Sequence, residues 1–556
     1  MLHKGRYTLI ALAWAAMIAL PPRPTQAQNP SRPFSLPFNV PPGPGTWLVG
    51  QQYGNTTGAY NFGAYWYSAG QGLHFGIDFS APCGTPVVAI GDGVVDQVDN
   101  FSFGILPHNL TIFHRDLGLT SLYGHLLKKP TVTKGQVVKR GEVVALSGDP
   151  EGTCESRPHL HLEVRSRDYN IAHNPATLID ADWSMLSTMG NFGASFTKDL
   201  FNPNRWQTIY DQPDVDFNEA RLNNYRAAWP PPSRSQPVPQ TLPAYTAPPI
   251  GTPTFRRLTE PGCCSLAWWS PDSRSVRFWN GPEGKRAALM AVGVDGGTPQ
   301  PILSGPVLSP DGQYDVRLEN GRVNVLHLTD MTSKSLITGG SWPRFSPGST
   351  RLLWQWAGGD SVPGSAPPQV EVWVANPDGS GLLSIVRQPG VSAHWLDDDR
   401  ILLSRREGLT RTSTLSIYTI STRQIQPLVT AKSLRNVSVA PGGRHILYFL
   451  AFQDDRAASG LYLLETRPGA SPAKLPFFGG WRWRDSNSIL YIPYEPGKPI
   501  SFALYDINTG QSRSVTDPAE EPIGILNGDW SVSPNGQYIV FWNAKDSALW
   551  LVNLSG

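Results

Sequence analysis

The C-terminal half of this 556-residue chain repeats one tight turn, and no other feature restricts the fold as strongly. Four copies begin with Ser-Pro, and three weaker copies keep fewer of the turn-forming residues. Proline at the second position, followed by Asp, Asn or Gly, suits a tight connection between two strands. The turns begin at Ser270, Ser309, Ser346, Leu396, Ala440, Arg484 and Ser533. Successive turns lie 37 to 50 residues apart, which predicts a seven-bladed β-propeller over residues 251–556.

The segments around these turns support a propeller. Alternating apolar runs follow the turns, as in residues 275–279 and 538–542, and such alternation is typical of half-buried strands. Residues 254–258 are strand-like but precede the first turn, so we expect them to complete the seventh blade by pairing with the last strand of the chain. The repeats resemble those of TolB-type β-propellers over about residues 254–556. A pair of β-sandwiches is the alternative fold.

The N-terminal half predicts a second domain, so that both halves are all-β. Between residues 45 and 180, short β-type runs alternate with glycine-containing turns, which is typical of an antiparallel sheet or sandwich. Proline marks the flanking segments: residues 28–44, and a connecting region at 181–250 whose Pro230–Pro249 stretch should be an extended linker. Residues 181–228 show no clear pattern, and one short helix at residues 217–222 is the single element that their sequence allows us to suggest.

Residues 1–27 are predicted to be a secretory signal peptide. Basic residues at positions 3, 4 and 6 precede an apolar stretch, and Thr25-Gln26-Ala27 is a suitable cleavage site. An uncleaved membrane anchor is the alternative, although the apolar run is short for a bilayer span. We therefore expect a bacterial protein of the cell envelope or the extracellular space, without a membrane span once the signal is removed. The net charge of +2 gives no electrostatic case for a nucleic-acid partner.

The four cysteines suit an exported protein but leave their pairing open. A bond between Cys83 and Cys154 would close a loop of about 70 residues and stabilise the fold by about 4 kcal/mol. Two unpaired buried thiols are the alternative. The adjacent Cys263 and Cys264 can either form a vicinal disulfide or stay reduced.

Histidine is concentrated in the N-terminal half, where seven of the 11 lie between His74 and His173. His159 and His161 are separated by one residue in an apolar, β-prone run, so both imidazoles should point to one face of a strand. His74 and Asp78 are four residues apart, and this even spacing also keeps two side chains on one face of an extended segment. The clustering predicts a functional site.

Two imidazoles and one carboxylate form a common catalytic zinc shell with one open position. His74, Asp78 and His161 are the candidate ligands of such a site. Zinc there would activate water and polarise a carbonyl oxygen. His125 and His159 would then flank the site, where one can transfer protons as a general base or acid and the other can stabilise the oxyanion.

Residues 45–180 resemble the lysostaphin- and LytM-type zinc metalloendopeptidases. The resemblance rests on three motifs in the order found in that family: His74-Phe75-Gly76-Ile77-Asp78, Tyr123-Gly124-His125-Leu126 and His159-Leu160-His161-Leu162-Glu163. It implies that His74, Asp78 and His161 bind zinc and that His125 and His159 form the catalytic pair. It also implies an endopeptidase that cleaves peptide bonds in the stems or cross-bridges of bacterial peptidoglycan.

The turn before the His-x-His motif departs from the family. The family has a Ser-Thr-Gly-Pro-type turn there, whereas this chain has Cys154-Glu155-Ser156-Arg157-Pro158. We expect Glu155 and Arg157 to lie near the cleft, where they would affect the choice of substrate. The propeller is expected to contact a protein partner or the wall. The alternative function is a non-catalytic scaffold that binds the wall or activates a hydrolase through its propeller.

Overall fold

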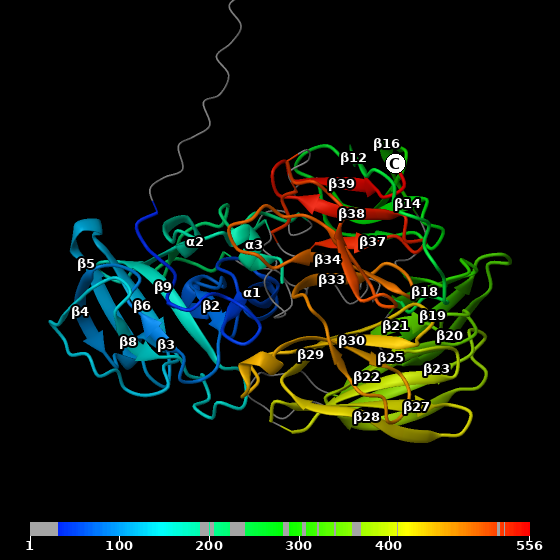
Figure 1. The fold of residues 1–556 in the computed structure, drawn as a ribbon, viewed down its shortest axis with the longest axis horizontal. Coiled ribbons are helices and arrows are strands. Elements are labelled where there is room, and N and C mark those ends of the chain that lie inside the picture. The colour runs from blue at the N-terminus through cyan, green and yellow to red at the C-terminus, as the bar shows by residue number, and fades with distance from the viewer. Residues whose placement is uncertain are drawn as a thin grey trace, which may run out of the picture.

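The computed structural model describes residues 32–189, 199–200, 205–222, 240–281, 288–302, 307–319, 322–338, 341–358, 369–408, 410–519, 523–526 and 529–556. The predicted signal peptide, residues 28–31 and residues 230–239 of the predicted linker lie outside these ranges. Strands make up most of the elements, which confirms the all-β prediction. Figure 1 shows an N-terminal β-body beside a larger propeller. No helix within these ranges has the length and apolar character needed to cross a membrane.

The N-terminal body is built on a nine-stranded sheet. Its main path is antiparallel and runs, in spatial order, β1 (Leu48–Gln51), β2 (Ile77–Ser80), β9 (His159–Ser166), β6 (Leu119–Gly124), β5 (Leu110–His114), β4 (Gly93–Val98) and β7 (Val137–Val138). Two further strands extend it from β9: β10 (Ile171–His173) and β11 (Val215–Asp216). A small second sheet pairs β3 (Pro86–Val88) with β8 (Val143–Leu146). The helices are short: α1 (Thr57–Phe62), α2 (Pro175–Leu178) and α3 (Trp183–Ser187).

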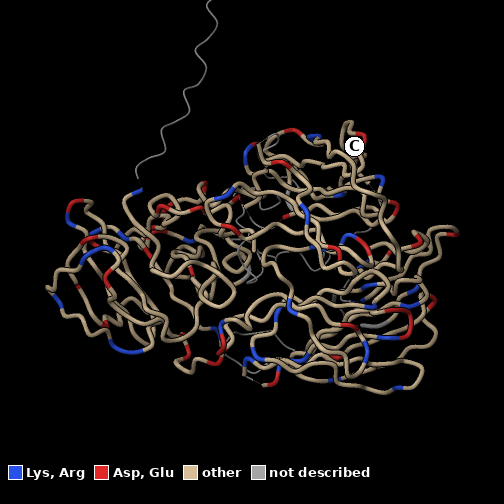
Figure 2. Tube along the Cα trace, viewed as in Figure 1, with Lys and Arg blue, Asp and Glu red and all other residues tan. Residues whose placement is uncertain are grey.

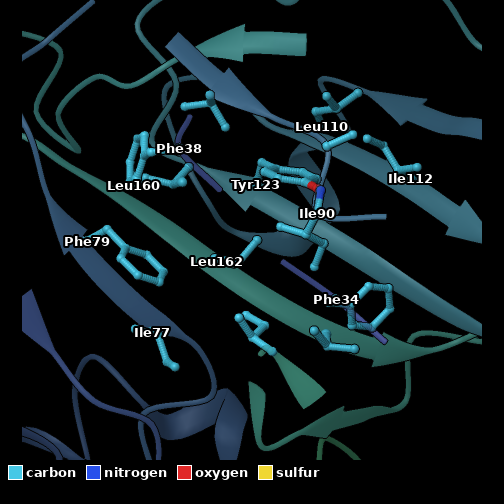
Figure 3. Close-up of a cluster of buried hydrophobic side chains, with 14 of the residues drawn as sticks. Phe34, Phe38, Ile77, Phe79, Ile90, Leu110, Ile112, Tyr123, Leu160 and Leu162 are labelled. Atoms are coloured by element: carbon cyan, nitrogen blue, oxygen red, sulfur yellow. The ribbon is translucent and has the colours of Figure 1, made fainter. Parts of the chain in front are cut away.

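Strand β9 separates the core from the candidate site. Leu160, Leu162 and Val164 are fully buried and pack into the hydrophobic core, which Figure 3 shows around Tyr123 and Phe79. Because strand side chains alternate, the residues between them point to the other face. The predicted same-face placement of the two histidines in this strand is therefore confirmed.

Two segments outside the predicted domain of residues 45–180 pack against its core. Phe34 and Phe38, from the proline-rich stretch that precedes β1, are buried in the N-terminal core, as Figure 3 shows. The predicted helix at residues 217–222 is wrong, because these residues form a turn and a bend after β11. Phe217 instead packs edge-on against Phe75, with the ring centroids 5.3 Å apart. Tertiary packing thus overrides a weak local helix preference.

The C-terminal body is a seven-bladed propeller of four-stranded sheets, as predicted. Blade 1 contains β13 (Ser265–Trp269), β14 (Ser275–Asn280), β15 (Ala288–Gly293) and β16 (Gly296–Pro301). Blade 2 contains β17 (Val307–Leu308), β18 (Tyr314–Glu319), β19 (Arg322–His327) and β20 (Ser333–Thr338). Blade 3 contains β21 (Ser341–Phe345), β22 (Leu352–Gly358), β23 (Gln369–Ala375) and β24 (Leu383–Pro389). Blade 4 contains β25 (Val391–Trp395), β26 (Arg400–Arg406), β27 (Thr412–Thr419) and β28 (Gln424–Lys432). Blade 5 contains β29 (Leu434–Val439), β30 (His445–Leu450), β31 (Gly460–Glu465) and β32 (Ala473–Lys474). Blade 6 contains β33 (Gly479–Trp483), β34 (Ser488–Pro493), β35 (Ala503–Asp506) and β36 (Gln511–Ser514).

The seventh blade closes the ring by joining the two ends of the repeat region. It contains β37 (Trp530–Val532), β38 (Tyr538–Asn543), β39 (Ala548–Asn553) and, from before the first repeat, β12 (Thr254–Arg257). Phe255 pairs with Val552 in this blade, which confirms the predicted closure. Figure 1 shows β12 beside β39 near the C-terminus.

The N-terminal body packs on the propeller face opposite the repeat turns. At the start of β33, the backbone of Gly480 lies close to the Thr188 carbonyl, and Phe452 donates its backbone N–H to the Pro44 carbonyl at 2.9 Å. At the far end of the blades, residues 240–250 run across the turns. Thr241 donates its hydroxyl to the Trp395 carbonyl at 2.6 Å, and Gly442 N–H donates to the Leu242 carbonyl at 2.8 Å. The propeller therefore lies between the N-terminal body and residues 240–250 of the linker.

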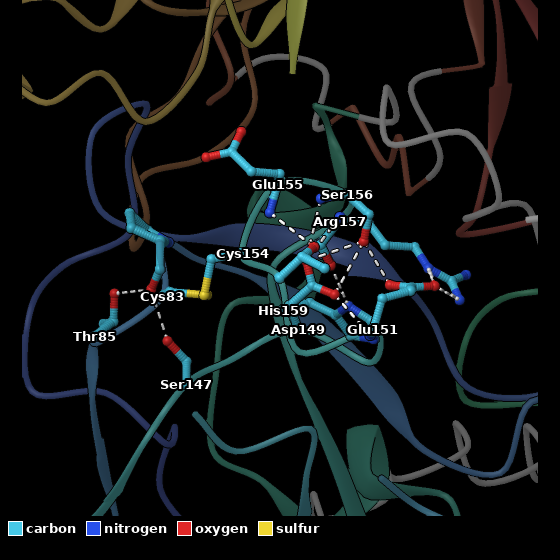
Figure 4. Close-up of a disulfide and its surroundings, with 12 residues drawn as sticks. Cys83, Thr85, Ser147, Asp149, Glu151, Cys154, Glu155, Ser156, Arg157 and His159 are labelled. Carbon is cyan, nitrogen blue, oxygen red and sulfur yellow. Dashed lines mark hydrogen bonds and ion pairs between the residues drawn. A yellow bond between two sulfur atoms is a disulfide. The ribbon is translucent and has the colours of Figure 1, made fainter. Parts of the chain in front are cut away.

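The structure joins all four cysteines in two disulfides, Cys83–Cys154 and Cys263–Cys264. The first spans 71 residues and anchors the loop before β9, as Figure 4 shows. Replacing both Cys83 and Cys154 by serine should lower the free energy of unfolding of the N-terminal body by about 4 kcal/mol, because the unfolded chain gains the entropy of an open loop.

Denaturant unfolding of the two serine double variants tests this expectation. The Cys263→Ser/Cys264→Ser variant is the matched control, since a bond between adjacent residues constrains almost no chain. An equal loss in both variants, or no loss in the first, would contradict it.

Candidate metal centre

Three side chains from neighbouring segments meet on the face of the sheet opposite the core. Asp78 lies on β2 and His161 on β9, and the two are direct cross-strand partners. His74 precedes β2 and is held by an isolated bridge to Gly54. His74 and His161 are buried, whereas Asp78 is partly exposed. The predicted ligand residues are thus brought together by two adjacent strands and one preceding loop.

The three ligand atoms form a compact triangle. His161 Nδ1 is 2.8 Å from Asp78 Oδ1, and His74 Nε2 is 3.3 Å from each of these atoms. Two atoms bound at about 2.0–2.1 Å to a tetrahedral zinc ion lie about 3.3–3.4 Å apart. Two sides of the triangle match this spacing and the third is slightly shorter. Donor types and geometry therefore fit a zinc ion with one open position.

Hydrogen bonds orient both imidazoles toward that triangle. His74 Nδ1 donates to the Gln52 carbonyl at 2.6 Å, which leaves its Nε2 lone pair facing the site. His161 Nε2 lies 3.2 Å from Glu163 Oε1 and donates to it, which leaves Nδ1 for a metal. Glu163 is fully buried and is held in turn by Arg165 Nε at 2.5 Å. No role of Glu163 was predicted from the sequence, although a residue two positions after His161 in a strand lies on the same face as His161.

The electrostatics of the site favour positive charge. Burial raises the pKa of Asp78, but His74, His159 and His161 outweigh it and hold that pKa well below its ordinary value. Burial lowers the pKa of His161, whereas Asp78 and Glu163 raise it, for a net pKa of about 9. Carboxylates on both sides of this imidazole thus attract a proton to the atom that would bind a metal ion.

Gly76 makes room for the His161 ring. A Cβ atom at this position would lie 2.6 Å from His161 Cε1, closer than carbon atoms approach without displacement. The glycine in the His74-Phe75-Gly76-Ile77-Asp78 motif is therefore required by close packing against the site.

His125 and His159 form a second pair beside the triangle, with ring centroids 4.8 Å apart. His125 Nδ1 donates to the Leu106 carbonyl, and His159 Nδ1 donates to the Arg157 carbonyl at 2.7 Å. Both rings therefore keep an unprotonated Nε2. Burial, followed by the nearby histidines, lowers the pKa of His125 to about 3, and burial also lowers the pKa of His159. Both shifts favour the neutral imidazole, which carries a lone pair on Nε2.

The site opens into a cleft of about 400 Å3 that both bodies line. Arg157 lines it as expected, paired with Glu151 at 2.8 Å, and Figure 4 shows this pair beside His159. Glu155 instead faces the propeller, where its carboxylate is 3.8 Å from Arg411 Nε. Arg435, at the start of β29, also lines the cleft. The place of Arg435 in the cleft was not predicted from the sequence, because no local motif indicates which blade faces the site.

Comparison with known proteins identifies the N-terminal body. Residues 72–175 match peptidase family M23. An uncharacterized metalloprotease of Buchnera aphidicola is 40% identical over 91 residues, which are 16% of this chain and 23% of that protein. Peptidoglycan DD-endopeptidase ShyA of Vibrio cholerae is 38% identical over 103 residues, which are 17% of this chain and 22% of ShyA.

The glycyl-glycine endopeptidase ALE-1 of Staphylococcus capitis is 27% identical over 175 residues, covering 31% of this chain and 44% of that protein. The chain thus spans less than half the length of each of these relatives. The matched segment contains all three motifs of the candidate centre. This chain therefore carries a domain of peptidase family M23, with relatives of the lysostaphin and LytM type, joined to a seven-bladed β-propeller.

Proposed function

We propose that this chain is an exported zinc endopeptidase that hydrolyses peptide bonds of bacterial peptidoglycan. The observation that carries the proposal is the triangle of His74, Asp78 and His161 ligand atoms at zinc spacing, within a domain of a peptidase family. The name of the relative ShyA, a peptidoglycan DD-endopeptidase, supports peptidoglycan peptides as the substrate class, and the name of ALE-1, a glycyl-glycine endopeptidase, supports cleavage of a peptide bond.

His74, Asp78 and His161 would hold one zinc ion, leaving a position open to the cleft. Zinc in this site would supply a Lewis acid that polarises the scissile carbonyl and makes water nucleophilic near neutral pH. Glu163 would keep His161 in the tautomer and orientation needed for binding.

His125 and His159 would handle the protons of the reaction. A neutral imidazole with a free Nε2 accepts the proton of the attacking water as the new C–O bond forms. The same proton passes from Nε2 to the amine nitrogen as the C–N bond breaks, and the imidazole is neutral again. The second imidazole orients the water or, once protonated, stabilises the oxyanion.

The rest of the chain fits this function as follows. We propose that residues 1–27 direct the protein to the cell envelope or the extracellular space. The propeller would contact a protein partner or the wall. The scaffold alternative predicts loss of site residues, whereas all five positions are filled and three of them converge.

Metal removal tests the proposal. Purified protein with zinc should release soluble peptides from insoluble peptidoglycan, a chelator should abolish the release, and added zinc should restore it. Release that persists after the metal content has been shown to be zero would refute the zinc peptidase. The variant His173→Ala should behave as wild type, because the partly exposed His173 pairs with Asp214 outside the cleft.

A further inference from the structure

The cleft of the M23 domain is completed by the propeller. Arg435 lies at the start of β29, the first strand of blade 5, and lines the same cleft as His125, His159 and the ligand triangle. Arg435 is at least 274 positions from each of those histidines in the sequence, because His161, the last of them, is 274 positions before it. The propeller is thus placed to touch whatever the cleft binds.

The lining of the cleft favours an anionic group near Arg435. Asp78 is the only acidic residue among the 17 that line it, and Asp78 belongs to the ligand triangle. Arg157 is already paired with Glu151 through both Nε and Nη2, and it packs over the Trp66 ring at 5.7 Å. Figure 2 shows both signs of charge interspersed along the two bodies, so an excess of one sign here is a local property.

Two further arginines strengthen the positive charge at this edge. Burial, followed by the charges of Arg406 and Arg411, lowers the pKa of Arg435 to about 10, so the Arg435 guanidinium remains cationic at neutral pH. Arg411 is 3.8 Å from Glu155, and its backbone carbonyl accepts a hydrogen bond from Ser433 just before β29. Arg406 and Arg411 thus add to the positive field around the Arg435 guanidinium.

The turn before β9 contacts Arg406 and Arg411. Arg406 Nη2 donates to the Ser156 carbonyl at 3.4 Å, next to the contact between Glu155 and Arg411. Glu155 and Ser156 belong to the turn that departs from the family pattern. Asp149 holds the turn by accepting hydrogen bonds from Ser156 N–H and the Ser156 hydroxyl at 3.2 and 3.0 Å. The unusual turn and the arginines therefore form one interface at the edge of the cleft.

We propose that Arg435 determines specificity by binding a carboxylate of the substrate peptide, with Arg406 and Arg411 adding to the positive field. This inference rests on the proposed function, because it assumes a peptide in the cleft. A guanidinium matches a carboxylate with two parallel hydrogen bonds, and such pairs are strongest where water is excluded. The propeller then acts as one wall of the substrate site, and the peptidase favours acidic stem peptides.

Binding of a matched peptide pair to the full chain tests the proposal. The probes are a synthetic peptidoglycan stem peptide with one free glutamate α-carboxylate and its twin with that carboxylate amidated. In the inactive His125→Ala background, the acidic peptide should bind about 10- to 100-fold more tightly than its twin, as expected for a charged hydrogen bond. Adding Arg435→Gln should remove this difference, and Arg435→Lys should restore part of it.

The control is Arg444→Gln, at the opposite end of the same blade, where Arg444 is exposed and contacts Glu465. It should leave the difference intact. Equal affinities for both peptides in the His125→Ala background, or an unchanged difference after Arg435→Gln, would overturn the proposal. Cleavage by the wild-type chain is read separately. A carboxylate preference without any cleavage supports the role of Arg435 and refutes the peptidase. Cleavage without a carboxylate preference supports the peptidase and refutes the role of Arg435.

Discussion

Replacing His161 by alanine is expected to abolish zinc binding and hydrolysis together. The variant loses one of three ligand atoms and leaves Glu163 without the imidazole that it orients. Loss of a hydrogen-bonding partner behind a ligand already costs about 10- to 100-fold in metal affinity, so loss of the ligand should cost more. Zinc contributes several kcal/mol to the transition state, and each 1.4 kcal/mol is tenfold in rate, which predicts a fall in kcat/KM of at least about a thousandfold.

His159→Ala is the matched comparison, because the residue lies on the same face of the same strand. Its Nδ1 is bound to the Arg157 carbonyl, and its Nε2 is 3.7 Å from Asp78 Oδ1. We expect this variant to keep a full equivalent of zinc in elemental analysis while activity falls. Equal loss of metal from both variants would show that the strand carries a two-histidine clamp instead.

The second large effect is expected at His125. The alanine variant should keep zinc and bind peptide, but kcat should fall by about 10²- to 10⁴-fold, the usual contribution of a general acid or base. The reason is that His125 supplies a neutral Nε2 at the cleft, held by the Leu106 carbonyl, and takes no part in the ligand triangle.

Steady-state kinetics with metal analysis of the same samples checks this expectation. His173→Ala serves again as the control for the loss of a histidine outside the cleft. The assignment fails if His125→Ala loses zinc in proportion to its activity, or if its kcat stays within about twofold of the wild-type value.

Local periodicity explains why much of this architecture was predictable. The repeat turns, four of them Ser-Pro, occur once in each blade, and the alternation in His159-Leu160-His161-Leu162 assigns leucines to the core and histidines to the site. Both patterns express a strand period of two between defined turns. Glu163 follows the same period, so its contact with His161 was within reach of the sequence.

The contribution of Arg435 was not predictable in this way. It depends on how the two bodies dock, which is decided by packing between residues far apart in the chain, such as Leu48 and Met189 against blades 5 and 6. Phe34 and Phe38 illustrate the same limit, because proline-rich sequence around them gives no sign of the core that they enter. Interfaces without local periodicity leave no signature in a single sequence.

A digest of a defined cross-linked peptidoglycan peptide, read by mass spectrometry, tests the central claim most directly. The zinc-loaded chain should convert a defined cross-linked peptide into two products whose masses sum to that of the substrate plus one water, with a new amine and a new carboxylate at a peptide bond. The His161→Ala variant should leave the substrate intact. Equal cleavage by the variant, or an intact peptide after incubation with the zinc-loaded wild type, would contradict the account.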